Sequence, residues 1–452
     1  MQTKSSIAII GAGYVGLPIA TVLAYSGYTV YIIETNKNRL ESIKKGQSFF
    51  HEEGLDKIIK ATLKTGNLIA TNSYAKSIPN CNIIFSCVGT PDNLDGSLNL
   101  TYIFNAAEEV SRYISSGTIY VQKSTVPVGT GKRIKEIFKT NNKHATYVSN
   151  PEFLRESSEL YDILCPDRVV VGGEDKIAVN RILNVYKQIE RHRNRIANLS
   201  NVQIKPCETK FISTDINSAE LIKVTANAFL ALKISFANSI AKLADKVDAD
   251  IVEIMKAVGS DKRIGHDFFE AGRGYGGGCL PKDVSGLIAS GMQNNVSLDI
   301  VKVTQEINNS MPSYIVEKLR NAMDANLDGK KIAVLGLTFK PGTSDMRQSP
   351  GILIANLLQK ANSIITIYDP CVKHKANDDI FIHHSITLHK SIESTIKNVD
   401  AIVVSTGWPE FLNYEAAEYA ESMRGKVFVD AVNQFSISDI EDAGLTYVGV
   451  GR

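Results

Sequence analysis

A glycine motif near the beginning of the chain constrains the fold most. Gly11-Ala12-Gly13-Tyr14-Val15-Gly16 follows the short apolar run Ser6–Ile10 and precedes an amphipathic stretch. This order predicts a strand, a tight turn and a helix whose N-terminus a pyrophosphate can approach. Glu34 ends a second predicted strand, Thr29–Ile33. A carboxylate there accepts hydrogen bonds from ribose hydroxyls and repels a 2′-phosphate, so we predict NAD as cofactor rather than NADP.

The same theme returns in the last third of the chain. The apolar run Lys331–Leu335 leads into Gly336, and a second run, Ile364–Tyr368, is followed by Asp369. The loop after the first of these runs lacks the three-glycine spacing, so we expect this half to bind a nucleotide differently. Further strand-like runs lie at 83–88, 118–122, 168–171, 401–405 and 426–430. Strands that alternate with helical segments indicate doubly wound parallel sheets.

Between the two halves, residues 218–247 have apolar positions at helical spacing and contain neither Gly nor Pro. We interpret them as one long helix, suited to forming the spine of a dimer. The predicted fold class is therefore α/β, with two Rossmann-like doubly wound domains joined by a central long-helix region. The predicted domains are an NAD-binding domain at 1–205, a central helical dimerisation domain at 206–315 and a Rossmann-like domain at 316–452.

Charge and composition argue against several classes of partner. Fifty basic and 48 acidic residues give a formal net charge of +2, and the sequence has no run of Lys and Arg interleaved with aromatic residues. We therefore expect no nucleic-acid partner. No stretch is long and apolar enough to predict a bilayer span, and the first apolar stretch has no cleavage site. We expect a cytoplasmic protein without a membrane partner.

The six cysteines are scattered along the chain and include no CxxC pair, which argues against a metal site or a redox dithiol. We expect all except Cys279 to be free buried thiols in a reducing cytosol. Cys279 differs because it lies between glycines 276–278 and Leu280-Pro281-Lys282-Asp283. Glycines leave room around the sulfur and let backbone amides point inward, which suits a thiolate, although a cysteine in a glycine turn is often incidental.

Two polar segments follow neighbouring predicted strands. Residues 123–130 (KSTVPVGT) come after the strand at 118–122, and residues 150–156 (NPEFLRE) come after the next run. Both should reach the carboxyl edge of the sheet, where ligands of doubly wound folds bind. Lys223 and Asn227, four residues apart, share one face of the long predicted helix. They either converge as donors on an oxyanion or have ordinary solvent and packing roles.

Seven motifs together resemble the UDP-glucose/GDP-mannose dehydrogenase family over nearly the whole chain. They are residues 11–18 (GAGYVGLP), 124–130 (STVPVGT), 150–156 (NPEFLRE), 166–172 (PDRVVVG), 219–223 (AELIK), 274–283 (GYGGGCLPKD) and 336–343 (GLTFKPGT). The resemblance implies an NAD-dependent oxidoreductase that converts UDP-glucose to UDP-glucuronate and reduces two NAD+. The sugar carbon would pass through a thiohemiacetal and a thioester on Cys279. A homodimer and a C-terminal domain that binds the UDP-sugar are also implied.

The resemblance also implies roles for individual residues. Lys223 and Asn227 would stabilise an oxyanion, Glu152 would position the hydrolytic water, and Thr125 and Asp283 would hold or activate waters beside Cys279. The implied cofactor-binding residues are Gly11, Gly13, Tyr14, Val15, Gly16, Glu34, Arg39, Val88, Gly89, Thr90, Ser124, Thr125, Glu156, Lys282 and Arg347. The implied substrate-binding residues are Glu152, Phe153, Leu154, Arg155, Glu156, Lys223, Asn227, Arg263, Phe268, Tyr275, Gly276, Cys279, Phe339 and Lys340.

The chain departs from the family pattern in three places. Residues 430–433 read Asp-Ala-Val-Asn instead of Asp-Gly-Arg-Asn, and the arginine that Val432 replaces ordinarily helps to bind the sugar nucleotide. Gly278 stands where serine is common, and residues 191–211 differ. Val432 keeps open a dehydrogenase of another UDP-hexose, such as a UDP-N-acetylhexosamine. Less favoured are a non-catalytic regulator that binds nucleotide sugars and a two-electron β-hydroxyacid dehydrogenase, which would need neither the cysteine loop nor the C-terminal domain.

Overall fold

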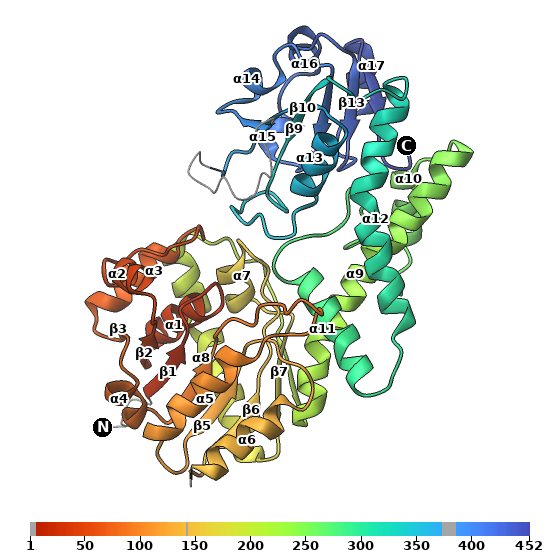
Figure 1. The fold of residues 1–452 in the computed structure, drawn as a ribbon. Helices are drawn as coiled ribbons and strands as arrows, with labels where there is room; N and C mark the ends of the chain where they lie inside the picture. The colour runs from red at the N-terminus through yellow and green to blue at the C-terminus, as the bar shows by residue number, and fades with distance from the viewer. Residues whose placement is uncertain (1–5, 142, 373–385) are drawn as a thin grey trace. The chain divides into compact units, whose positions relative to one another are not determined.

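The computed structural model describes residues 6–141, 143–372 and 386–452, which form two compact units, 1–226 and 227–452 (Figure 1). Each unit contains one twisted sheet with helices on both faces. The expected α/β class with two doubly wound sheets is therefore confirmed. The three domain ranges expected from the sequence stay a prediction.

The sheet of the first unit has the strand order β3-β2-β1-β4-β5-β6-β7-β8. Its strands are parallel except that β7 is antiparallel to β6. The strand order reverses between β1 and β4, which is where doubly wound folds bind ligands. The strands are β1 Ser6–Ile10, β2 Thr29–Ile33, β3 Leu68–Thr71, β4 Ile83–Ser86, β5 Ile119–Gln122, β6 Thr146–Ser149, β7 Arg168–Gly173 and β8 Lys210–Thr214.

Helices cover both faces of this sheet because its central strands are apolar on both sides. One core lies under α1, α3, α7 and α8, and a second lies under α5 and α6. The helices of this unit are α1 Gly16–Tyr25, α2 Lys37–Lys44, α3 Leu55–Lys64, α4 Tyr74–Ser77, α5 Thr101–Tyr113, α6 Thr130–Thr140, α7 Glu159–Leu164 and α8 Lys176–Ser200.

The long helix expected from the sequence is confirmed as α9, Ile216–Val247, which has 32 residues. It begins in the first unit and ends in the second. The expectation that no stretch is long and apolar enough for a bilayer span is wrong for α9, which passes that test by length and composition alone, although core helices of soluble proteins also pass it. Alanines of its second half lie in the core of the second unit.

The sheet of the second unit is wholly parallel and has the order β11-β10-β9-β12-β13-β14. Its central pair, β9 and β12, occupies the same topological position as β1 and β4 in the first sheet. The strands are β9 Lys331–Leu335, β10 Ile364–Tyr368, β11 Ile386–Leu388, β12 Ala401–Val404, β13 Val427–Asp430 and β14 Thr446–Val448.

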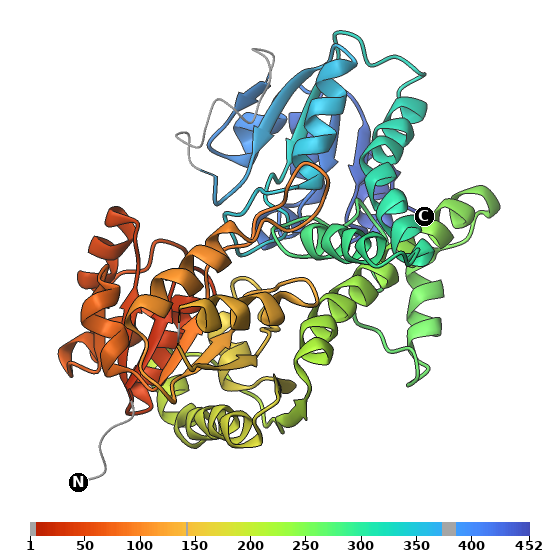
Figure 2. The same ribbon diagram turned by 60° about the horizontal axis from the view of Figure 1, so that its bottom comes forward.

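Helices α12 and α13 pack beside one another against one face of the second sheet, as Figures 1 and 2 show. Helices α14, α16 and α17 contribute to the core on the opposite face. The helices of this unit are α10 Ile251–Gly259, α11 Leu280–Gln293, α12 Asp299–Ala322, α13 Pro350–Lys360, α14 Ile392–Ile396, α15 Pro409–Leu412, α16 Ala416–Ser422 and α17 Ile437–Asp442.

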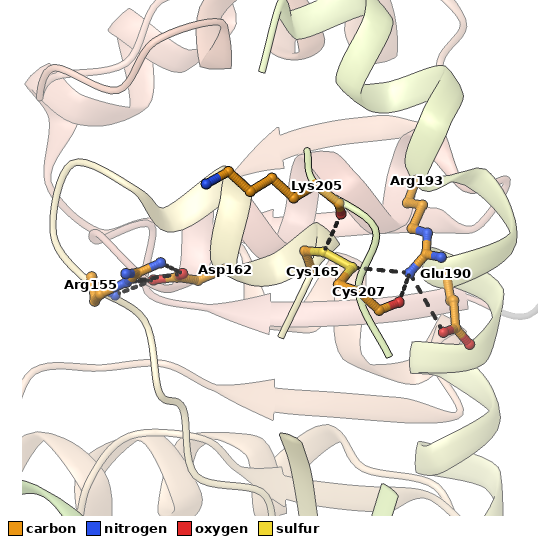
Figure 3. Close-up of a disulfide and its surroundings, with 7 residues drawn as sticks. All are labelled: Arg155, Asp162, Cys165, Glu190, Arg193, Lys205 and Cys207. Carbon is orange, nitrogen blue, oxygen red and sulfur yellow. Dashed lines mark hydrogen bonds and ion pairs between the residues drawn. A yellow bond between two sulfur atoms is a disulfide. The ribbon is translucent and has the colours of Figure 1, made fainter. Parts of the chain in front are cut away.

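The expectation of five free buried thiols is wrong, because Cys165 and Cys207 form a disulfide (Figure 3). The two residues are 42 apart in sequence, but each precedes one of a pair of adjacent parallel strands. In that register Arg168 lies opposite Lys210, so the residues three positions earlier also lie opposite one another, with 5.9 Å between their Cα atoms. Of the other four, Cys81 and Cys87 are free and buried, whereas Cys371 is half-buried and Cys279 is exposed.

Candidate active site

The three glycines after β1 have different steric environments. Gly11 adopts a φ of 89°, and a Cβ there would lie 2.9 Å from the carbonyl oxygen of Cys87. A Cβ at Gly16 would lie 1.9 Å from the carbonyl oxygen of Gly11. At Gly13 no described atom lies within 4 Å of the Cβ position, so the backbone faces open space. The first and third glycines therefore permit the tight turn, and the second leaves room for a pyrophosphate.

Helix α1 and Glu34 complete a cradle for NAD. No side chain caps the N-terminus of α1; Leu17 donates its N–H to the Gly13 carbonyl at 3.1 Å and Pro18 has none, so the Gly16 N–H is the one at the first turn that can face an anion. The buried Glu34 carboxylate accepts from the backbone N–H of Ala12 at 3.2 Å and of Asn36 at 2.8 Å. Carboxylate oxygens have further lone pairs that ribose hydroxyls can use. The residues present therefore fit a dinucleotide whose ribose 2′-oxygen carries no phosphate.

The other expected cofactor residues of the first unit surround the same sheet edge. The guanidinium of Arg39 stacks 4.3 Å from the centroid of the Phe49 ring, and Tyr14 contacts Phe50 at 4.5 Å between ring centroids. Val88, Gly89 and Thr90 follow β4, and Ser124 follows β5 and donates its hydroxyl to the Val88 carbonyl at 2.7 Å. Thr125, the residue after Ser124, is buried. The loops after β1, β4 and β5 thus share one edge.

A buried ion pair lies at the end of β6. Lys223 Nζ is 3.0 Å from Glu152 Oε1, and the other carboxylate oxygen accepts from the Leu154 N–H at 2.7 Å. Burial alone would raise the pKa of Glu152, but the charge of Lys223, the Leu154 N–H and the charge of Lys123 together hold that pKa below its usual value. The guanidinium carbon of Arg168 lies over the Phe153 ring, 4.0 Å from the ring centroid. Glu152 is therefore a buried, ionised carboxylate.

Sequence reasoning missed two residues that support this pair. Lys123 is buried, donates to Asn150 Oδ1 at 3.4 Å and lies 5.4 Å from the Tyr186 ring centroid. Glu220, one turn before Lys223, accepts from the backbone N–H groups of Gly129 at 2.8 Å and Gly131 at 2.9 Å. Glu220 thereby ties the start of α9 to the loop after β5. The AELIK motif contains Glu220, but only the structure shows what it binds.

Arg155, an expected substrate contact, has an internal partner. Its side chain and backbone N–H both donate to the carboxylate of Asp162, with the shortest contacts at 2.6 Å (Figure 3). Glu156 lies in the same loop, between β6 and α7. The arrangement fixes this loop after Phe153 and uses guanidinium donors that we expected to be available to substrate.

The second unit contains a chain of polar contacts next to Cys279. Asn227 Nδ2 donates to Asp283 Oδ2 at 2.6 Å, and Lys282 Nζ donates to Asp283 Oδ1 at 2.6 Å. Cys279 is the N-cap of α11, and its carbonyl accepts from the Asp283 N–H at 2.9 Å. Asp283 is buried whereas Cys279 is exposed. The positive end of α11 favours negative charge on a sulfur placed there.

The glycine loop before Cys279 packs tightly against neighbouring loops of the second unit. A Cβ at Gly277 would lie 2.9 Å from the Phe339 ring, and one at Gly278 would lie 2.3 Å from the Arg347 guanidinium. Asp345 holds that guanidinium through contacts of 2.6 to 3.0 Å. The space that serine would need at position 278 is therefore occupied by Arg347 in this chain.

Four expected substrate residues of the second unit occupy distinct settings. Tyr275 is buried, and its backbone N–H donates to Asn308 at 2.7 Å, while Gly276 packs against the Gln348 carbonyl. Phe268 adopts a φ of 62°, which is uncommon for a bulky residue. Lys340 Nζ lies 5.9 Å from the Phe339 ring centroid.

Arg263 is the most exposed of the expected substrate contacts. Its side chain is 89% exposed, and it pairs with Asp261 of the same turn at 2.6 Å. Of the catalytic candidates, Thr125, Glu152 and Lys223 lie in the first unit. Asn227, Cys279 and Asp283 lie in the second. Helix α9 carries one member of each group, Lys223 and Asn227, four residues apart.

The three parts of the chain match three models of one protein family. Residues 5–190 match the NAD binding domain of the UDP-glucose/GDP-mannose dehydrogenase family, residues 217–310 its central domain and residues 333–437 its UDP binding domain. A UDP-glucose 6-dehydrogenase of Bacillus subtilis (strain 168) is 35% identical over 450 residues, which cover 99% of this chain and 98% of the relative. One from Rhizobium meliloti (strain 1021) is 34% identical and covers 99% of both chains.

Solved structures give the same picture. The UDP-glucose dehydrogenase of Pyrobaculum islandicum superposes with a TM-score of 0.88 at 32% identity, covering 99% of this chain and 98% of the other. The UDP-D-ManNAc dehydrogenase of Pyrococcus horikoshii gives a TM-score of 0.86 at 25% identity, with 99% of both chains covered. Both similarities extend over the whole chain rather than over a single domain.

Proposed function

Because this chain belongs to the UDP-glucose/GDP-mannose dehydrogenase family, we propose that it oxidises UDP-glucose to UDP-glucuronate with two NAD+ as oxidants. The observation that carries the proposal is the exposed Cys279 at the N-terminus of α11, followed by the buried Asp283 that binds Asn227. A two-electron alcohol dehydrogenase has no need for such a thiol. A four-electron oxidation needs a nucleophile that retains the aldehyde between its two steps.

When bound, NAD accepts a hydride in each of the two oxidations. The first oxidation removes a hydride and a proton from the sugar CH2OH group and leaves an aldehyde. The Cys279 thiolate adds to the aldehyde carbon, and the resulting oxyanion takes a proton to give a thiohemiacetal. Loss of a second hydride and a proton produces a thioester, and water releases the carboxylate and restores the thiolate.

The family resemblance assigns a separate task to each of the remaining catalytic candidates. Lys223 and Asn227 donate to the oxygen on which negative charge develops. Glu152, held ionised by Lys223 and Lys123, positions the water that hydrolyses the thioester and accepts its proton. Asp283, with Thr125, keeps waters and the Asn227 amide in place. These assignments rest on the family resemblance together with the ion pair at Glu152 and the hydrogen bonds at Asp283.

The same proposal assigns one set of residues to NAD and another to the UDP-sugar. The open backbone at Gly13 and the uncapped start of α1 support pyrophosphate binding, and Glu34 supports ribose binding. We assign Arg39, Val88–Thr90, Ser124, Glu156, Lys282 and Arg347 to NAD as well. Phe153–Glu156, Arg263, Phe268, Tyr275, Gly276, Phe339 and Lys340 are assigned to the UDP-sugar. Arg155 has the weakest support, because Asp162 already binds it.

The proposal includes a homodimer built on α9. Four large apolar side chains lie exposed along the part of this helix within the second unit. They are Phe229, Phe236, Leu243 and Val247, between 48% and 60% exposed. Their near-heptad spacing places them along one stripe, and exposed apolar stripes of this kind mark protein interfaces. Cytoplasmic location, and the absence of nucleic-acid and membrane partners, belong to the same proposal.

Product analysis tests the proposed reaction. Purified protein is incubated with limiting UDP-glucose and excess NAD+, and NADH is counted while mass spectrometry identifies the product. We expect two NADH per UDP-glucose consumed and a product with the mass of UDP-glucuronate. One NADH with free aldehyde would contradict the thioester route. Turnover of a UDP-N-acetylhexosamine without turnover of UDP-glucose would instead favour the alternative substrate that Val432 leaves open.

A further inference from the structure

Arg273 is a buried cation without a carboxylate partner among the described residues. Its side chain enters the carboxyl edge of the second sheet and is only 7% exposed. The guanidinium donates to four neutral oxygens: the Phe339 carbonyl at 2.5 Å, Thr406 Oγ1 at 3.0 Å, Ser405 Oγ at 3.2 Å and the Thr338 carbonyl at 3.5 Å. Burial lowers its pKa to about 10, partly offset by the negative charge of Asp369. A buried charge of this kind is costly unless an opposite charge joins it.

Asp369 attracts Arg273 but is already engaged elsewhere. Its Oδ2 atom accepts from the backbone N–H groups of Leu337 at 2.8 Å and Thr338 at 2.9 Å, and from the Trp408 indole at 3.2 Å. Its Oδ1 atom accepts from the Cys371 N–H at 2.9 Å. The acid at the end of β10 therefore stabilises the loop after β9 and does not pair directly with Arg273.

In the described part of the second unit, the start of α13 offers few backbone N–H groups to a diphosphate. Helix α13 begins with Pro350, which has no N–H, and the Ser349 hydroxyl accepts from the next N–H, that of Gly351, at 3.2 Å. The start of α13 is thus partly closed by its own residues. A diphosphate bound at this edge must obtain its positive partners chiefly from side chains.

Arg273 occupies the position at which such a partner is needed. Its four acceptors come from the loops after β9 and β12, the two strands between which the order of the sheet reverses. Ligands of doubly wound sheets bind at this point. Its backbone N–H also donates at 2.9 Å to the carbonyl of Ala431, the residue before Val432. An arginine therefore lies beside the position at which this chain has valine.

We propose that Arg273 binds the diphosphate of the UDP-sugar at the carboxyl ends of β9 and β12. The proposal rests on the proposed function and adds a residue to it. Guanidinium groups pair with phosphate oxygens through parallel hydrogen bonds, and an incoming diphosphate supplies the directly bonded anion that Arg273 does not have among the described residues. Because Arg273 lies six residues before Cys279, the same bond also connects the nucleotide with the loop that leads to the nucleophile.

The test measures binding without chemistry. Dissociation constants for UDP and for uridine are determined by NMR titration on the full-length protein and on Arg273→Met, Arg273→Gln and Arg273→Lys. Gln retains hydrogen-bond donors without charge, and Lys retains charge. Met and Gln should weaken UDP binding roughly 10- to 100-fold, the range for one charge-assisted contact, and leave uridine binding unchanged. Lys should keep most of the UDP affinity.

Control variants and outcomes separate this role from a structural one. Arg424→Met removes an exposed arginine of the same unit, between α16 and β13, that pairs with Asp400, and it should leave UDP affinity unchanged. UDP affinity that survives Arg273→Gln would overturn the proposal, as would equal weakening of UDP and uridine. A wild-type protein that binds NADH but not UDP would overturn the proposed substrate class itself, and the role of Arg273 with it.

Discussion

At the scale of single residues, the site depends on how each charge is balanced. Glu152 has two cations and a backbone N–H around it and remains ionised, whereas Arg273 has only neutral acceptors among the described residues. The sequence shows that both residues are charged, but it does not show which groups surround each charge. Lys223 and Asn227 were predictable as a pair because helical spacing places them on one face. The contribution of Lys123 to Glu152 was not, because it depends on how the loops after β5 and β6 approach one another.

Replacing Cys279 tests the assigned nucleophile. Cys279→Ser should lower the rate of UDP-glucuronate formation at least about 1,000-fold, because a serine hydroxyl is not ionised at neutral pH and lacks the nucleophilicity of a thiolate. The rate is followed by chromatography of the sugar nucleotide. Cys371→Ser, at the half-buried thiol outside the candidate site, should retain activity. Normal UDP-glucuronate production by Cys279→Ser would refute the assignment.

Glu159 gives a prediction about pH. Burial, together with the neighbouring Glu52 carboxyl, raises the pKa of Glu159 to about 10. The unfolded chain loses this proton near the ordinary value of 4.5, but the folded chain keeps it until about pH 10. The unfolded state therefore binds fewer protons across this interval, and the free energy of unfolding falls as pH rises through it.

Glu159→Gln removes that dependence. We expect the variant to have a higher Tm than wild type at pH 8.5 and a smaller advantage at pH 5.5. The shift should reach several degrees, since about 1 kcal/mol moves the Tm of a domain of this size by roughly 2–4 °C. Glu53→Gln, at an exposed neighbouring position, is the matched control. Parallel Tm curves for wild type and Glu159→Gln would show that the proton is not retained.

At the scale of elements, strong hydrophobic patterns predicted the central strands and the long helix, and edge elements were missed. Strand β8 is mostly exposed and carries polar residues at three of its five positions, and the apolar run of β3 is only three residues long, so neither shows the longer apolar run of a central strand. The expected helix at 218–247 differs from α9 by two residues at its start. Pairing of β7 with β8 has no local signal, and for that reason the disulfide could not be anticipated from cysteine spacing.

The disulfide should contribute measurably to stability. Closing a loop of 42 residues corresponds to about 4 kcal/mol in the chain-entropy relation. Reduction with dithiothreitol, or the double variant Cys165→Ala/Cys207→Ala, should lower the Tm of the first unit by roughly 10 °C. Reductant should have no effect on the double variant. An unchanged Tm after thiol titration has confirmed reduction would contradict the prediction.

At the scale of the whole molecule, the fold and the family followed from the order of motifs along the chain. The two nucleotide-binding patterns, the long helix and the cysteine loop occur in an order that sequence alone displays. The second sheet shows the limit of that reasoning. Its strand-end acid looks equivalent to Glu34 in the sequence, yet five internal donors converge on Asp369 after folding, whereas two backbone N–H groups donate to Glu34.

Assembly gives a prediction at this scale. If α9 forms the dimer spine, Phe229→Glu combined with Leu243→Glu should convert the dimer to monomer, because two carboxylates would be buried without partners in the interface. Light scattering after size-exclusion chromatography measures the mass. Ile177→Glu, at an exposed apolar position on α8, should leave the mass unchanged. A wild-type protein that is monomeric at micromolar concentration would contradict the proposed spine.

The bond between Cys165 and Cys207 is compatible with only one register of β7 against β8. Sliding β7 past β8 by two residues would keep the side chains on their faces but move the cysteines apart by roughly 6–7 Å along the strand, beyond disulfide reach. Once β7 and β8 are paired, the bond can therefore form only in the native alignment. Quantifying that bond by peptide mapping would distinguish correctly aligned molecules from compact misaligned ones in any refolded preparation.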